Sequence, residues 1–239
     1  MFGDTTTPEV GQRLGIQYVR TLQPTISVNY GDKELHFHQE SMGLMAISGV
    51  VWDAGLLMVD YLCELHRHRH SCTESVLGRV LDIGCGTGIA GISALVVGSE
   101  KVLFTDIERL DCFNFNVEQL PTSQQDLVEF ELYKWNEDSV PSRFLGADDS
   151  IVWDTVLCSD LLYEVKSHAA LLSVLKKIRF RKAIFSYKKR HDEPEKAFFS
   201  TLASWCAVRV VDTSACITSV NLSKSSITGL YIVVVEPHE

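Results

Sequence analysis

The chain has 239 residues, 46% of them apolar and 22% charged, which is the composition of an ordinary globular protein with enough apolar material for a full core. Its net charge of −9, from 31 acidic and 22 basic residues, argues against binding along a nucleic-acid backbone, which needs clustered cations. The longest nearly apolar stretch, residues 43–59, is interrupted by Ser48 and Asp53 and is too short for a membrane span. We therefore expect neither nucleic acid nor membrane as a partner.

The cysteines and the N-terminus bear on the compartment. Seven cysteines, an odd number without a C-x-x-C pair, favour a reducing environment without disulfides. The first residues lack the basic and apolar segments of a secretory signal. A cytosolic location is the expectation, with the nucleus left open.

The first elements in the chain predict a hairpin and a helix. Residues 26–30 and 34–38 alternate around Gly31 and Asp32, as in a β-hairpin. Residues 52–65 carry apolar side chains near helical spacing, and residues 66–71 follow as a polar loop.

Strand and helix signals alternate from residue 80 onward. The predicted strands are 80–83, 102–105, 129–134, 154–159, 182–187, 207–212 and 230–235, and the predicted helices are 89–97, 108–119, 167–177 and 194–206. Such alternation is typical of an α/β fold with a parallel sheet covered by helices on both faces. Without a linker or repeat, we expect a single domain over 1–239, with a hairpin and helix extension at 14–66 and a core at 76–239.

A glycine-rich turn is the most informative motif. The apolar strand that contains Asp82 runs directly into Gly84, Gly86 and Gly88, and a second strand ends at Asp106. Glycines let a ligand lie against the backbone, and the N-terminus of the following helix attracts a carboxylate. Asp82 would then lie near an ammonium, and Asp106 would accept both hydroxyls of a ribose. S-adenosylmethionine (SAM) carries all of these groups.

A dinucleotide-binding turn and a glycine turn without a ligand are two other interpretations of this segment. Residues 86–91 fit the G-x-G-x-x-G pattern of dinucleotide-binding folds, but that pattern requires its first glycine directly after the strand. Counted from Gly84 it fails at Ile89, and an acid within the strand suits an ammonium better than a phosphate. A glycine turn without any ligand is disfavoured by the two acids at matching strand ends.

Two tryptophans and an Asp–Tyr pair are further candidates. Trp52 begins a predicted helix and could form a ligand wall, while Trp135, at the end of the third strand, could stack on adenine; both could instead be core aromatics. Asp160 follows an apolar strand at the edge where open α/β sheets bind ligands, although it could simply cap the next helix. Tyr163 could be an interior tyrosine with a satisfied hydroxyl.

Two basic segments have a functional and a simpler interpretation. His66, His68 and His70 could suggest a metal, but the arginines between them and the lack of nearby Cys or acidic ligands favour a solvated loop, so no metal site is expected. Residues 188–190, Lys-Lys-Arg, could contact an acidic partner segment, and a solvated turn is favoured.

The order of these motifs resembles the seven-β-strand SAM-dependent methyltransferases, and within them the protein-lysine methyltransferases. The resemblance extends over residues 26–235 and is closest to the type that modifies the AAA ATPase valosin-containing protein. It rests on a W-x-A motif at 52–54, on the segments 105–108 and 134–135, and on a D-x-x-Y motif at 160–163.

The resemblance implies a seven-strand Rossmann-like fold, SAM as methyl donor with S-adenosylhomocysteine as product, and a protein substrate, with a chaperone or AAA ATPase among the candidates. The implied SAM contacts are Trp52, Gly84, Cys85, Gly86, Asp106, Trp135 and Ser159. Asp160 and Tyr163 would face the substrate lysine. Cys85 stands where serine is also common, and residues 187–193 are particular to this chain, which leaves the substrate open.

Three alternatives to lysine methylation remain at this point. The same fold methylates small molecules, and it also methylates histidine or N-terminal amines. A non-catalytic module that binds SAM is the third. Fold alone does not choose among them.

Overall fold

The computed structural model describes residues 18–40, 47–68, 75–135, 140–145, 152–213, 221–222 and 227–238. Its strands are β1 Thr25–Tyr30, β2 Lys33–His38, β3 Arg79–Ile83, β4 Lys101–Asp106, β5 Val128–Leu132, β6 Trp153–Ser159, β7 Phe180–Lys188, β8 Cys206–Val211 and β9 Leu230–Pro237. Its α-helices are α2 Tyr18–Thr21, α3 Asp53–Arg67, α4 Ile89–Val96, α5 Asp111–Glu118, α6 Thr122–Gln125, α7 His168–Lys177 and α8 Asp192–Leu202, and short 3-10 turns are η1 Ser142–Phe144, η2 Leu161–Tyr163 and η3 Val165–Ser167. Residues 14–17 and 41–46 of the predicted extension lie outside the described residues.

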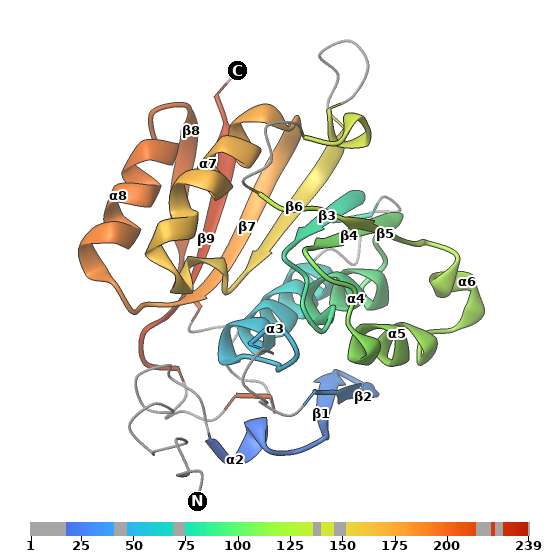
Figure 1. Ribbon diagram of the computed structural model, residues 1–239. Helices are drawn as coiled ribbons and strands as arrows, with labels where there is room; N and C mark the ends of the chain where they lie inside the picture. Colours follow the sequence, from blue (N-terminus) through green and yellow to red (C-terminus); the bar gives the residue numbers. More distant parts are fainter. Residues whose placement is uncertain are drawn as a thin grey trace, which may run out of the picture.

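The central sheet has seven strands in the order β5-β4-β3-β6-β7-β9-β8 (Figure 1). Neighbouring strands from β5 to β7 pair in parallel, as expected, but β9 pairs antiparallel with both β7 and β8. The expectation of a wholly parallel sheet is therefore wrong for the last strand. An apolar strand pattern does not encode direction, and antiparallel neighbours need no helical crossover between them.

The two faces of the sheet bury different side chains because alternate residues of a strand point to opposite sides. Val80 of β3 and Ile184 of β7 contribute to the core beneath α3, α4 and α5. Their neighbours Leu81 and Phe185 contribute to the core beneath α7 and α8. Figure 1 shows α7 and α8 on one side of the sheet and α3 on the other.

The predicted hairpin forms as β1 and β2, which pair Tyr30 with Lys33 across the turn. It joins the core on the α3 side, where the hydroxyl of Tyr30 hydrogen-bonds that of Ser93 in α4 at 3.0 Å. Buried Asn116 of α5 accepts a hydrogen bond from the His38 N–H (2.7 Å) and donates to the Thr87 carbonyl oxygen (3.0 Å). The hairpin is thus tied to the glycine-rich turn. That the chain forms a single domain remains a prediction.

Several element ends differ from the sequence prediction. Helix α3 continues to Arg67, so His66 is helical rather than part of a loop. Helix α5 begins at Asp111, three residues later than expected, and β5 ends at Leu132, which leaves Trp135 beyond the strand. Helix α8 spans 192–202 rather than 194–206. Helix and strand ends are set by local capping and tertiary contacts, which apolar spacing does not report.

The order of the strands determines where a ligand can bind. From β3 the chain moves outward to β4 and β5, and then returns to place β6 on the opposite side of β3. The loops after β3 and β6 therefore diverge to opposite faces, leaving a crevice at the carboxyl ends of these two strands. Ligands of open α/β sheets bind at such a switch point.

Asp82, near the end of β3, holds the turn at this crevice. Its side chain is fully buried, and Oδ2 accepts a hydrogen bond from the N–H of Gly91 in α4 at 2.8 Å. The other oxygen, Oδ1, is buried without a hydrogen-bond partner in the described part of the chain. Burial raises the pKa of the Asp82 carboxyl to about 8, outweighing the Gly91 hydrogen bond, which acts in the opposite direction.

This buried acid makes stability depend on pH. Between about pH 4, the ordinary aspartate range, and about pH 8, the folded protein keeps a proton on Asp82 that the unfolded chain releases. The contribution of Asp82 to the free energy of unfolding therefore falls as pH rises through this window, by at most about 1.4 kcal/mol per pH unit, and is constant above it. We expect the free energy of unfolding of the natural protein to fall relative to that of Asp82→Asn over the same window. Urea unfolding of both proteins at pH 5, 7 and 9 measures this, and a difference independent of pH would contradict the buried, protonated acid.

Candidate functional site

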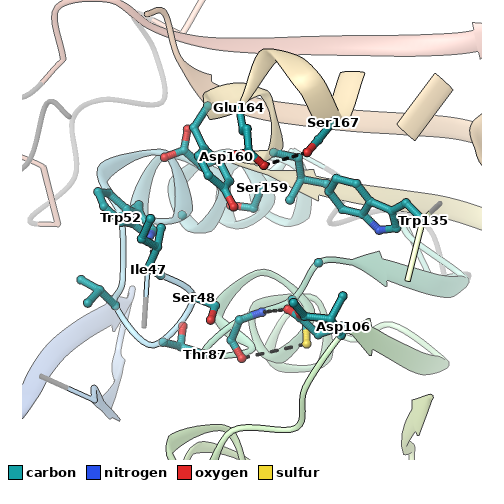
Figure 2. A pocket seen from close by; sticks show the side chains of 18 of the residues that line it. Ile47, Ser48, Trp52, Thr87, Asp106, Trp135, Ser159, Asp160, Glu164 and Ser167 are labelled. Atoms are coloured by element: carbon teal, nitrogen blue, oxygen red, sulfur yellow. Dashed lines mark hydrogen bonds between the residues drawn. The ribbon is translucent and has the colours of Figure 1, made fainter. Parts of the chain in front are cut away.

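A cavity of about 620 Å³ opens at the carboxyl ends of β3, β4 and β6. Figure 2 shows Trp52 and Trp135 on opposite sides of it, with Asp106 on one wall and Asp160, Glu164 and Ser167 on the other. Nine of the residues proposed from the sequence line it: Trp52, Gly84, Cys85, Gly86, Asp106, Trp135, Ser159, Asp160 and Tyr163. Ligand pockets for small molecules have volumes in this range.

The glycine-rich turn forms the floor of the cavity with a backbone that needs glycine. Gly84, Gly86 and Gly88 have φ values of 62°, 52° and 81°, a region that residues with a Cβ avoid. A Cβ on Gly86 would lie 2.5 Å from the carbonyl oxygen of Ser48. The segment that enters α3 therefore packs directly on this turn, and together they enclose the cavity.

Asp106 is bound to the turn from the neighbouring strand. Its Oδ2 accepts the N–H of Gly86 at 2.9 Å (Figure 2). Its Oδ1 accepts the N–H of Ile107 at 2.7 Å. Burial raises the pKa of this carboxyl, and the backbone hydrogen bonds that it accepts oppose the increase. Because each carboxylate oxygen can accept a second hydrogen bond, Asp106 retains acceptor capacity on the cavity wall.

Asp82 and Gly88 do not line the cavity. The sequence placed Asp82 beside a ligand ammonium, but the structure places its carboxyl group behind the turn, where it accepts the N–H of Gly91. Gly88 begins α4, and a Cβ there would lie 2.8 Å from the ring of Phe113. Both residues shape the turn from the inside, which a motif alone does not distinguish from direct contact.

Cys85 reaches the cavity, but its backbone N–H is already engaged. That N–H donates to the carbonyl oxygen of Thr105 in β4 at 3.0 Å. Burial also raises the pKa of the Cys85 thiol well above its ordinary value, so the thiol stays protonated. Cys85 contributes shape to the floor rather than a backbone donor or a reactive thiolate.

The two tryptophans are held in different ways. The indole N–H of Trp52 donates to the Ile47 carbonyl oxygen at 2.9 Å, which folds the entrance segment back on itself. The Trp135 ring lies against the turn, since a Cβ on Gly84 would lie 3.1 Å from it. Both side chains are half-buried and line the cavity, and Trp135 also packs against the core beneath α7 and α8.

Asp160 and Tyr163 lie on the opposite wall. Asp160 follows β6 with a left-handed backbone (φ 54°), and Tyr163 is 39% exposed at the end of η2. Tyr163 is therefore not an interior tyrosine. Partial burial raises the pKa of the Tyr163 hydroxyl, which keeps it neutral.

Arg190 is the clearest correction to the sequence prediction. Residues 188–190 were expected to form a solvated turn, but the Arg190 side chain is only 8% exposed and lines the cavity. Its guanidinium donates to both oxygens of Asp160, from Nη1 to Oδ1 at 2.8 Å and from Nη2 to Oδ2 at 2.9 Å. The sequence of three consecutive basic residues, 188–190, does not indicate which of their side chains points into the protein.

Other residues of the cavity were not among the predicted contacts, although Lys134 lies within the 134–135 segment of the resemblance. Ile47 and Ser48 come from the segment before Trp52, Lys134 precedes Trp135, and Glu164, Lys166 and Ser167 follow Tyr163. Each lies within a few residues of a motif position, and that proximity was the one available signal. The side chain of Glu164 contacts both Lys166 Nζ (2.6 Å) and Ser167 Oγ (3.0 Å).

The histidine-rich segment gives no metal-like arrangement where it can be seen. His66 is in α3 and His68, just after it, places Nε2 2.6 Å from Glu64, while His70 lies outside the described residues. Within the described ranges no group of three or more His, Cys, Asp or Glu side chains could hold a metal ion. In the same ranges no helix is long and apolar enough to cross a membrane.

Solved structures share this fold at low sequence identity. The chain superposes on a METTL16 methyltransferase domain with a TM-score of 0.54 and 14% identity, covering 84% of this chain and 88% of that one. It matches a magnesium protoporphyrin IX methyltransferase from Synechocystis, solved with SAM, with a TM-score of 0.51 and 16% identity, covering 77% and 79%. These matches confirm the predicted seven-strand Rossmann-like methyltransferase fold.

Curated relatives are protein methyltransferases. The chain is 29% identical over 133 residues to the protein N-lysine methyltransferase METTL21A of Danio rerio, covering 55% of each. It is 26% identical over 148 residues to the protein N-terminal and lysine N-methyltransferase EFM7 of Yarrowia lipolytica, covering 54% of this chain and 51% of that protein. The chain thus spans about half the length of these curated relatives.

A shorter match and a family model agree with these relatives. Over 98 residues the chain is 33% identical to the electron transfer flavoprotein beta subunit lysine methyltransferase of Xenopus laevis, covering 38% of each. The model of a family described as lysine methyltransferase matches residues 29–205, well over half of the chain. This protein belongs to the lysine methyltransferase family.

Proposed function

We propose that this protein transfers a methyl group from SAM to the ε-amine of a lysine in another protein. The observation that carries the proposal is one cavity, at the switch point of the sheet, that joins the glycine-rich turn and Asp106 to the wall formed by Asp160 and Tyr163. Membership of the lysine methyltransferase family supports the same chemistry.

The residues present suit SAM. Gly84 and Gly86 leave bare backbone in the floor of the cavity, and the remaining acceptor capacity of Asp106 suits the two hydroxyls of a ribose. Trp135, against the turn, would stack on adenine, and Trp52 with Ser159 would border the methionine portion. When bound, SAM supplies an activated methyl group on a positive sulfonium.

The other wall would bind and orient the lysine. A lysine amine with an ordinary pKa of ~10.4 must lose its proton before it can accept a methyl group, and burial beside a positive charge favours that loss. Asp160 would accept a hydrogen bond from the amine, and the Tyr163 ring would form one side of its channel. Holding the amine in line with the methyl group is the larger contribution of the protein.

The cavity rim supports a protein substrate over a small molecule. Ile47 and Tyr163, both part of the cavity lining, are 46% and 39% exposed, although each is large and apolar. Exposed apolar side chains around an opening are typical of surfaces that bind another macromolecule. An N-terminal amine is a second candidate acceptor, because the Yarrowia lipolytica relative is named for both N-terminal and lysine methylation.

The proposal also includes a substrate class and a compartment. A chaperone or an AAA ATPase remains the proposed substrate class, on the sequence resemblance alone. The described cysteines 63, 85, 112, 158 and 206 are all free, which supports a reducing compartment, and we propose the cytosol or the nucleus.

Methyl transfer can be tested directly with SAM carrying a labelled methyl group. Incubated with the protein and an extract depleted of small molecules, it should label one or a few protein bands, and mass spectrometry should find the label on lysine. The matched control is the Asp106→Ala protein. Label on an N-terminus would favour the second candidate, label on metabolites alone would contradict a protein substrate, and no label would favour a non-catalytic module.

Removal of Asp106 should weaken SAM binding. Asp106→Ala loses charge-assisted hydrogen bonds of ~1.5–3 kcal/mol each, so we expect affinity to fall roughly tenfold or more. Calorimetric titration with SAM measures this. The control is Glu100→Ala, which removes an exposed acid directly before β4, at the opposite end of the strand from Asp106. This variant should bind SAM like the natural protein. Equal affinity of the two variants would show that Asp106 does not contact the ligand.

A further inference from the structure

The carboxylate of Asp160 is not a free negative charge. Arg190 holds it with two parallel hydrogen bonds of 2.8 and 2.9 Å, and the two side chains are only 8% and 6% exposed. Paired donors on a guanidinium match both oxygens of a carboxylate and fix its orientation. Asp160 Oδ1 also accepts the backbone N–H of Lys188 at 3.2 Å, so Oδ2 keeps the freer lone pair.

Arg190 is itself held in place from behind. Buried Glu195, in the first turn of α8, accepts the backbone N–H of Arg190 at 2.8 Å and that of His191 at 2.9 Å through Oε1. The backbone N–H of Asp160 donates to the Ser186 carbonyl oxygen at 2.7 Å. The start of α8 and the end of β7 thus place Arg190 so that it stabilises the left-handed backbone of Asp160.

This arrangement changes the charge that a substrate amine meets. A bare carboxylate beside an amine favours the ammonium form, which cannot accept a methyl group. A carboxylate whose charge is compensated by a guanidinium still accepts a hydrogen bond but favours the ammonium far less. Arg190 therefore allows Asp160 to orient the amine without keeping it protonated.

We propose that Arg190 is a positioning residue of the methyl-transfer site, which fixes the Asp160 carboxylate and cancels its charge so that the acceptor lysine can lose its proton. This inference rests on the proposed function and deepens it, because it assigns how that site obtains a neutral nucleophile.

The other charged groups near Asp160 do not replace this role. Glu164 and Lys166 of the rim pair with each other at 2.6 Å, and Asp106 is held by two backbone N–H groups. Tyr163 is neutral, with its pKa raised by burial, and Glu195 faces the backbone of Arg190. Lys134, the remaining charged residue of the cavity lining, comes from the segment after β5, on the Trp135 side.

The test is the pH dependence of kcat, which reports the protonation of groups in the bound complex. In Arg190→Gln the Asp160 charge is uncompensated and favours the ammonium form of the substrate lysine. The acidic limb of the kcat profile should therefore move to higher pH by about one unit or more. Arg190→Lys keeps the charge but loses the paired geometry, so kcat should fall while the limb stays in place. Removal of one partner of a buried pair lowers stability, so the double variant Asp160→Asn/Arg190→Gln is measured as well. With both charges gone, its limb should return to the position of the natural protein.

A matched control and SAM titration separate the possible outcomes. Arg181→Gln removes an arginine near the other end of β7, where it pairs with Asp154 at an exposed position, and should leave the profile unchanged. SAM affinity should be unaltered in all Arg190 variants. The proposed role of Arg190 would be overturned if the acidic limb of the kcat profile stayed in place in Arg190→Gln and kcat fell equally in all variants. Methyl transfer by the natural protein would still support the proposed function. Absence of transfer by the natural protein would overturn the proposed function, and the role of Arg190 in it.

Discussion

The site depends on one buried hydrogen bond, from the N–H of Gly91 to the carboxyl group of Asp82. It joins the end of β3 to the first turn of α4 across a loop in which Gly84, Gly86 and Gly88 all take left-handed conformations. Such a loop has few side chains of its own to hold it, so its shape must be imposed from behind. The cost is a carboxyl buried so deeply that its pKa is raised to about 8.

Once the turn is held, the surrounding elements close on it. The Ser48 carbonyl lies against Gly86, Asp106 binds the Gly86 N–H, and the Trp135 ring rests on Gly84. Asn116 adds the hairpin to the same turn through the Thr87 carbonyl oxygen. The contacts of Ser48 and Trp135 require a bare backbone at Gly86 and Gly84. The glycine pattern therefore determines both the floor of the cavity and how closely its walls can approach.

The electrostatics of the two walls differ in kind. On the Asp106 side, backbone N–H groups satisfy the carboxylate without cancelling its charge, which suits a neutral diol such as ribose. On the Asp160 side, a guanidinium cancels the charge, which suits an amine that must be neutral. Two aspartates at strand ends look alike in the sequence, and their partners make them chemically different.

The local sequence pattern by itself determined most of the secondary structure and part of the site. Apolar periodicity located the hairpin, α3 and the strands of the sheet, and glycines and acids at strand ends marked the floor of the cavity, because these features depend on residues close in the chain. The direction of β9, the withdrawal of Asp82 behind the turn and the inward position of Arg190 were decided by the tertiary structure alone. Direction depends on which strands become neighbours, and the role of a charged side chain depends on what it meets across 9 residues, as for Asp82 and Gly91, or 30, as for Asp160 and Arg190. The partner of a charge is a property of the folded chain, and no spacing along the sequence encodes it.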